Sequence, residues 1–166
     1  ALCAPLNYEV VHTFVRVRKE PELQGQELGL QKKGVILSID AIHADWVRLE
    51  EEPAAVTGGE RAVGGSNASL AGGWMLTDGT TLSTPGMKLG ILLRPHITPV
   101  ANDTFWQITR PGGCVGYQSP GGDARGEPAQ QHGELAQGSS VHVEAECGLW
   151  ARVKLAGGAK ELWLPM

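Results

Sequence analysis

The stretch that decides the fold is GVILSIDAIHADWVRL, residues 34–49. A gap-free copy of its pattern returns 104 positions later as GSSVHVEAECGLWARV, residues 138–153. A glycine opens each stretch, a Trp–x–Arg sequence stands near each end, and Asp40 aligns with Glu144. A pattern that returns at a fixed offset indicates one structural unit used twice.

Alternating apolar and polar residues predict a strand at the start of each stretch, with one buried face. The apolar face of these two strands is formed by Leu37, Ile39, Ala41, Val141, Val143 and Ala145. The short joins IHAD and ECGL suit a hairpin. We therefore expect a second strand after each join, beginning at Trp46 or Trp150.

The similarity between the two copies continues on both sides of these stretches, with small gaps. Residues 8–21 and 106–120 both begin with an aromatic residue and end at a proline, and Trp74 finds a partner in Trp163 on a short closing strand. A loop rich in Pro or Gly precedes the hairpin in each copy, at 19–33 and 118–137. The predicted organisation is a first domain at 1–80, a loop insertion in it at 53–73, a linker at 81–103 and a second domain at 104–166.

The first copy resembles the bacterial-type SH3 domain, SH3b, a small partly open β-barrel. The resemblance rests on the opening strand VRVRKEP, a loop ending in LGLQKKG, the hairpin VILSIDAIHADWVRL and the closing GWM, and it covers nearly all of 8–80. It is weaker over 104–166, where CVGYQSPGG departs from the opening-strand pattern. The resemblance implies an all-β protein of two tandem SH3-like small β-barrels.

This resemblance also implies a non-catalytic protein-binding or scaffolding module rather than an enzyme. Bacterial SH3b domains often attach to cell-wall peptides, so the alternative is the targeting module of a hydrolase. Eukaryotic SH3 domains bind Pro-rich peptides in an aromatic groove. The continuation GWMLTDGTTL resembles tandem SH3-like proteins of algal lineages, which implies an accessory subunit of an organellar membrane complex such as a photosystem, in a plastid after removal of a targeting segment. Fold does not fix function, so the ligand stays open.

The Trp–Arg pairs are the best candidates for contact with a partner. Trp46 and Trp150 are expected to point away from the buried face, each beside an Arg that can stack on a ring, and such residues anchor many interfaces. The alternative is that the long loop or the other domain covers each ring; for Trp74 and Trp163 a core position is expected. The predicted partner-binding residues are Trp46, Arg48, Trp150, Arg152, Tyr8, Trp74 and Trp106.

Charge and composition exclude several classes of function. The net charge of -4 argues against a nucleic-acid partner. No apolar run is long enough to span a bilayer, so any association with a membrane would run through partners. The sequence GERAVGGS at 59–66 lacks the Lys that a phosphate-binding loop needs. We expect no cofactor and no metal site.

The three cysteines, Cys3, Cys114 and Cys147, show no CxxC spacing, so free thiols are expected and a Cys114–Cys147 disulfide is left open. A small enzyme or inhibitor that uses a thiol or a histidine is the rival class. Asn67 and Asn102 each begin a glycosylation sequon, and sequence alone does not say whether either is used.

Overall fold

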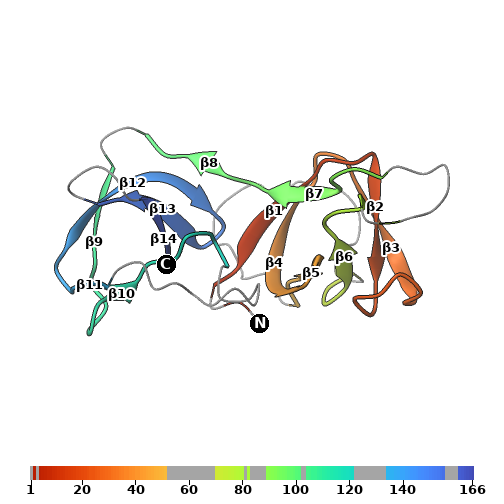
Figure 1. Cartoon of the computed structure of the whole chain (residues 1–166), viewed down its shortest axis with the longest axis horizontal. Coiled ribbons are helices and arrows are strands. Elements are labelled where there is room, and N and C mark those ends of the chain that lie inside the picture. The colour runs from red at the N-terminus through yellow and green to blue at the C-terminus, as the bar shows by residue number, and fades with distance from the viewer. Residues whose placement is uncertain are drawn as a thin grey trace. The chain divides into compact units, whose positions relative to one another are not determined.

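The computed structural model is all-β, with no helix in the part of the chain it describes (Figure 1). The described residues are 2, 4–51, 70–80, 82, 89–101, 104–121, 134–155 and 161–166. Within them, no helix long and apolar enough to cross a membrane is found. The chain divides into two compact units: the first unit is residues 8–94, and the second unit combines residues 1–7 with 95–166.

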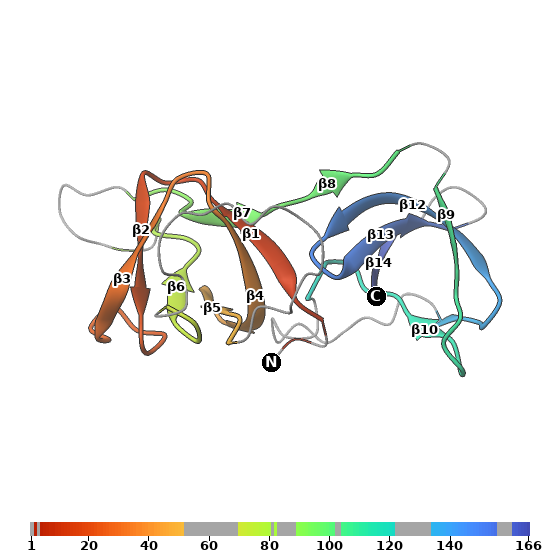
Figure 2. The ribbon, with the colours of Figure 1, turned by 180° about the vertical axis from the view of Figure 1, so that it is seen from behind.

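The first unit is built on a seven-stranded sheet with the order β3-β2-β6-β5-β4-β1-β7. Its strands are β1 (Leu6–Val10), β2 (Phe14–Arg18), β3 (Glu27–Lys32), β4 (Ile36–His43), β5 (Trp46–Leu49), β6 (Trp74–Leu76) and β7 (Leu93–Pro95). Figure 2 shows β2 and β3 side by side, with β3 outermost in this unit.

The second unit has a five-stranded sheet in which β14, β13, β12 and β8 follow one another and β9 also pairs with β12. Its strands are β8 (Thr98–Pro99), β9 (Phe105–Gln107), β10 (Cys114–Val115), β11 (Glu134–Leu135), β12 (Ser140–Cys147), β13 (Trp150–Lys154) and β14 (Glu161–Pro165). β10 and β11 form a separate ribbon. An isolated bridge between Tyr117, two positions after β10, and Trp163 links this part of the chain to β14.

The apolar faces expected for the two hairpin strands are buried. Leu37, Ile39 and Ala41 of β4 expose 5% or less of their surface, while the polar residues between them are half-buried. The equivalent residues of β12, from Val141 to Ala145, behave in the same way. The period-two pattern therefore predicted both the strand and its inward face.

Both hairpins carry a β-bulge at the same place. The pairing register shifts between Ile39 and Ala41 in the first unit and between Val143 and Ala145 in the second. The residue in between is the acidic one: Asp40 in the first unit, and its equivalent 104 positions later in the second. A bulge redirects a side chain and strengthens the local twist, so the two acidic side chains leave their strands at equivalent points.

The structure also differs from the sequence-based expectations. Strands β3 and β11 lie within the ranges expected to be long loops, and β7 and β8 lie within the range 81–103, expected to be a linker. Residues 1–7, which the sequence places with the first domain, group with the second unit. Most of the insertion at 53–73 and both sequons lie outside the described residues, as does Cys3.

Candidate functional site

Arg48 on β5 forms the best-defined polar cluster of the first unit. Its Nε and Nη2 atoms donate to the two carboxylate oxygens of Asp40, at 2.8 and 3.1 Å. Its Nη1 atom lies 3.2 Å from Glu51 Oε1. The guanidinium carbon lies 5.9 Å from the centre of the Trp74 ring, within cation–π range. The hydrogen bond to Asp40 is the main cause that raises the pKa of Arg48.

Strand register brings these side chains together. Arg48 pairs with Ala41 of β4 on one side and with Trp74 of β6 on the other. The bulge at Asp40 redirects the carboxylate next to Ala41, so it can reach the guanidinium. All members of the cluster therefore come from the first unit itself. The planar guanidinium is held by the carboxylates of Asp40 and Glu51.

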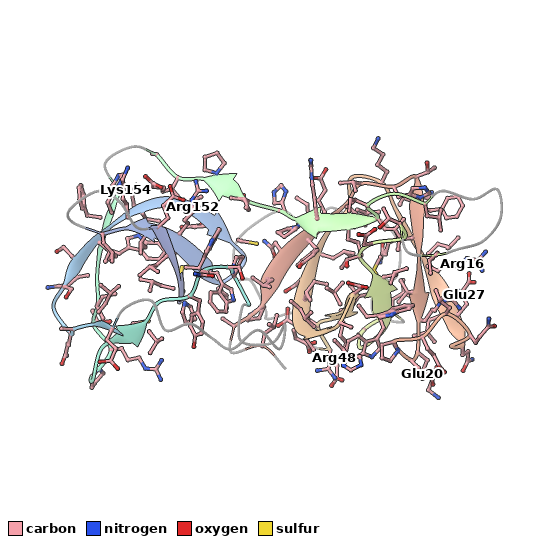
Figure 3. The ribbon with its side chains drawn as sticks, in the orientation of Figure 1. Arg16, Glu20, Glu27, Arg48, Arg152 and Lys154 are labelled. Carbon is pink, nitrogen blue, oxygen red and sulfur yellow. The ribbon has the colours of Figure 1, made fainter. Side chains whose placement is uncertain are left out.

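The second unit repeats the cluster in a looser form. Arg152 pairs in register with Trp163, but its Nε atom lies 3.9 Å from Glu144 Oε2 and forms no hydrogen bond, although that atom is buried. Its Nη1 atom is also 3.9 Å from Glu161, and Lys154 lies at the same distance from Glu144. Figure 3 labels Arg152 and Lys154, which lie two positions apart on β13.

The expectation that Trp46 and Trp150 lie on a less buried face is wrong, because the rings are 9% and 0% exposed. Trp46 stands in a central strand, in register with His43 on one side and Leu76 on the other. Trp150 is covered in a different way. Its ring is edge-on to that of Tyr117, with the ring centres 5.4 Å apart. Its indole N–H donates a hydrogen bond to the backbone of Ala4, near the N-terminus.

Residues 4–7, here called the N-terminal strap, run across the tip of the β12–β13 hairpin. Trp150 Nε1 donates to the Ala4 carbonyl at 2.9 Å, and the Leu149 amide donates to the Pro5 carbonyl at 2.9 Å. The next accepting carbonyl is that of Asn7, which receives the amide of His96 at 2.8 Å and the thiol of Cys147 at 3.3 Å. The side chains of Ala4 and Leu6 are buried.

Gly148 makes room for the strap. This residue has a φ of +61°, and a Cβ atom built on it would lie 2.7 Å from the Pro5 carbonyl oxygen and 2.9 Å from Leu6 Cα. At the same turn position the first unit has Ala44, with a φ of +49°. The methyl group of Ala44 would occupy the path that the strap follows in the second unit.

The other predicted residues differ in how accessible they are. Tyr8 is 3% exposed and belongs to the core. Trp106 of β9 is half-buried, opposite Val141, and packs against the core cluster of the second unit. Trp74 is also half-buried. Trp74 therefore contacts Arg48, whereas Tyr8, Trp46 and Trp150 are buried.

Sequence reasoning missed the strap entirely and named neither Asp40 nor Glu51 as a partner of Arg48. The alignment of Asp40 with Glu144 was a usable signal for the ion pairs, because an acidic residue repeated opposite a repeated Arg indicates a pair. No local signal marks the contacts of the strap with the hairpin tip, since Leu149 and Trp150 lie more than 140 positions from Pro5 and Ala4.

The cysteines described by the structure are free: Cys114 is half-buried and Cys147 is buried. Burial raises the pKa of both thiols, so neither has the lowered value of an activated nucleophile. Over the described ranges there is no group of three or more His, Cys, Asp or Glu side chains that could hold a metal ion.

No protein-family model matches the chain, and no curated protein or solved structure matches it.

Proposed function

We propose that this chain is a non-catalytic protein-binding and scaffolding module made of two SH3-like units, and that it serves as an accessory subunit of a larger assembly. The observation that carries the proposal is the N-terminal strap. An extended chain segment lies on the second unit, where an indole N–H and a hairpin-tip amide hold it and Gly148 leaves room for its close approach. The unit therefore has the groups that bind an extended peptide.

The strand pairings support two units of one kind. Val47 pairs with Met75 in the first unit, and Ala151 pairs with Leu164 at the equivalent place in the second. The order β3-β2-β6-β5-β4-β1 corresponds to β11-β10-β14-β13-β12-β9, with the Tyr117 bridge taking the place of the β2–β6 pair. A shared order with shared bulges agrees with a tandem SH3-like organisation.

Recognition at the strap site works mainly through the main chain. The groups that bind the strap are donors, and they meet the carbonyl oxygens of Ala4, Pro5 and Asn7, which any extended segment can present. Side-chain selectivity comes from the small space around Ala4 and from the buried position of Leu6. A Pro fits at position 5 because only its carbonyl is used and its missing N–H is not needed.

The proposed host is an organellar membrane complex such as a photosystem, on which the chain would sit through protein contacts. The acidic net charge of -4 and the mixed surface suit docking to a protein rather than to a nucleic acid. A cell-wall peptide is the alternative ligand, and it is tested by the same purification.

The test is native purification from the source organism in a gentle detergent, followed by mass spectrometry of the species that migrate with the chain. We expect co-migration with a large assembly at fixed stoichiometry. Isotope-labelled recombinant chain added before lysis is the control, because its appearance in the complex would indicate association after lysis. Migration of the native chain as a free species, or only with cell-wall fragments, would contradict the proposed function.

A further inference from the structure

Exposed apolar side chains gather on β2 and β3, the two strands at one end of the first unit's sheet. Phe14 of β2 is 49% exposed, and Leu28 and Leu30 of β3 are 36% and 48% exposed. The register pairs Phe14 with Lys32 and Arg16 with Leu30, so Phe14 and Leu30 are diagonal neighbours. Large apolar residues beside each other at a sheet edge mark an interaction surface more often than isolated ones do.

The outer side of β3 is an open edge, since β3 is the last strand in the order of the described sheet. The Lys33 amide donates to the Thr13 carbonyl at 3.1 Å, which sets the alternation of bonded and non-bonded pairs along the ribbon. By this alternation the Arg16–Leu30 pair is non-bonded. The N–H and C=O of Leu30 therefore point away from β2, toward the open edge.

Natural proteins usually protect such an edge with charges, a proline, a bulge or a very short strand. β3 has no proline, and its bulge lies at the far end of the ribbon, where Val17 and Arg18 face Gly29 and Glu27 and Leu28 is the extra residue. The second unit differs, because β11 is two residues long and carries Glu134 where Leu30 stands in β3. Among the described residues, the long apolar edge is therefore found in the first unit and not in the second.

The positive charges on this edge favour a partner with acidic residues. Lys32 and Lys33 are exposed at the end of β3, and no ion pair is found for either among the described residues. The two other cations of the ribbon already have partners: Arg16 is paired with Glu27 at 2.5 Å, and Arg18 donates to the Gly25 carbonyl at 2.8 Å. Figure 3 labels Arg16 and Glu27. The unpaired positive charges therefore stand next to the apolar side chains of Leu30 and Phe14.

We propose that β3 binds an extended segment of a partner protein as an added strand, through the main-chain groups of Leu30. The segment carries apolar residues beside Leu28 and Leu30 and acidic residues beside Lys32 and Lys33. This surface belongs to the first unit, whereas the proposed function rests on the second, so either can fail without the other.

The experiment is a titration of the 15N-labelled full chain, followed by NMR, with a short peptide of alternating valine and glutamate. A peptide of alternating valine and lysine is the matched control. We expect amide shifts confined to β2 and β3, slower hydrogen exchange at the Leu30 amide, and weaker binding as salt is added. Equal binding of the two peptides, or shifts centred elsewhere, would overturn the proposal.

Two variants separate the main-chain contribution from the charge contribution. Leu30→Pro removes the outward amide, and an edge strand tolerates proline, so peptide binding should be lost while the rest of the spectrum is kept. The double variant Lys32→Glu, Lys33→Glu should weaken binding of the acidic peptide by about fivefold or more and favour the basic one. Lys19→Glu, at the opposite end of the ribbon, should leave the preference unchanged.

Vesicles that contain phosphatidylserine test the other class of partner. If the vesicles bind through β3 and the acidic peptide does not, the surface is a membrane-contact site and the proposed strand addition is wrong. If Leu30→Pro retains peptide affinity, the segment does not pair with the β3 backbone, which also overturns the proposal.

Discussion

Trp150 Nε1 donates a hydrogen bond to the backbone carbonyl of Ala4 at 2.9 Å, across 146 positions of sequence. Both residues are buried, and the ring of Tyr117 meets the indole edge-on. The bond therefore closes the second unit with a segment from the other end of the chain. A buried acceptor that loses its donor is costly, so stability of this unit depends on the strap.

Trp150→Phe should lower the free energy of unfolding by more than Trp46→Phe does. Both changes remove similar ring volume, but only Trp150→Phe leaves the Ala4 carbonyl buried without its donor, which costs about 1–3 kcal/mol more. No hydrogen bond of the Trp46 indole is found among the described residues. Urea unfolding of the two variants measures the difference, and equal losses would show that the bond contributes nothing.

Gly148→Ala should be much more damaging than Gly138→Ala. Both glycines have a positive φ, so each alanine brings a backbone cost of about 1–2 kcal/mol. A Cβ at Gly138 meets nothing within 4 Å, whereas one at Gly148 overlaps the Pro5 carbonyl.

The measurement is thermal unfolding together with hydrogen exchange of the Leu149 amide. Faster exchange of that amide in Gly148→Ala, with normal exchange in Gly138→Ala, is the expected result. Similar stability of the two variants would mean that the strap moves aside without cost.

A double-mutant cycle should give a larger coupling for Asp40 with Arg48 than for Glu144 with Arg152. The first pair is bidentate at 2.8 and 3.1 Å, while the second approaches only to 3.9 Å. Because each pair is partly exposed, the first coupling should be about 0.5–1 kcal/mol and the second near zero. The cycle uses Asp40→Asn with Arg48→Gln and Glu144→Gln with Arg152→Gln, repeated at high salt; equal couplings would contradict the expectation.

The second unit should lose stability in alkali through Cys147. Burial raises the pKa of this thiol in the folded chain above that of the unfolded chain. The unfolded state then releases its proton first, so the contribution is complete below the unfolded pKa and is lost as the pH rises through the folded one. Unfolding between about pH 7.5 and 10 measures it. Cys147→Ala should flatten this pH dependence more than Cys114→Ala, and no difference between them would exclude the thiol as the cause.

The sequence predicts the repeated hairpin well because the physical signal is local. Alternation over 34–49 and 138–153 predicts which side chains are buried, and the tight joins predict the turns. The bulges and ion pairs lie in the same stretches but were not predicted, although the acidic residue and the Arg repeat together. These features need only the pairing of neighbouring strands.

The rest depends on contacts between distant parts of the chain. A period-two pattern assigns Trp46 and Trp150 to the outer face but does not reveal what packs on that face. Strand β3 was expected to be part of a loop because the range 19–33 contains proline and glycine. Its pairing with β2 decides the outcome, as tertiary context often does for strands.

The strap also affects the order in which the two units fold during synthesis, because its partners on the hairpin tip are made late. Ala4 to Asn7 leave the ribosome long before Leu149 and Trp150, their partners at the hairpin tip. Contacts between such distant residues form slowly. The residues of the first unit are all made in between and are free to fold first. Until translation reaches β13, the backbone carbonyls of Ala4 and Pro5 lack their donors on the hairpin tip, so this part of the strap stays available to chaperones or to other chains.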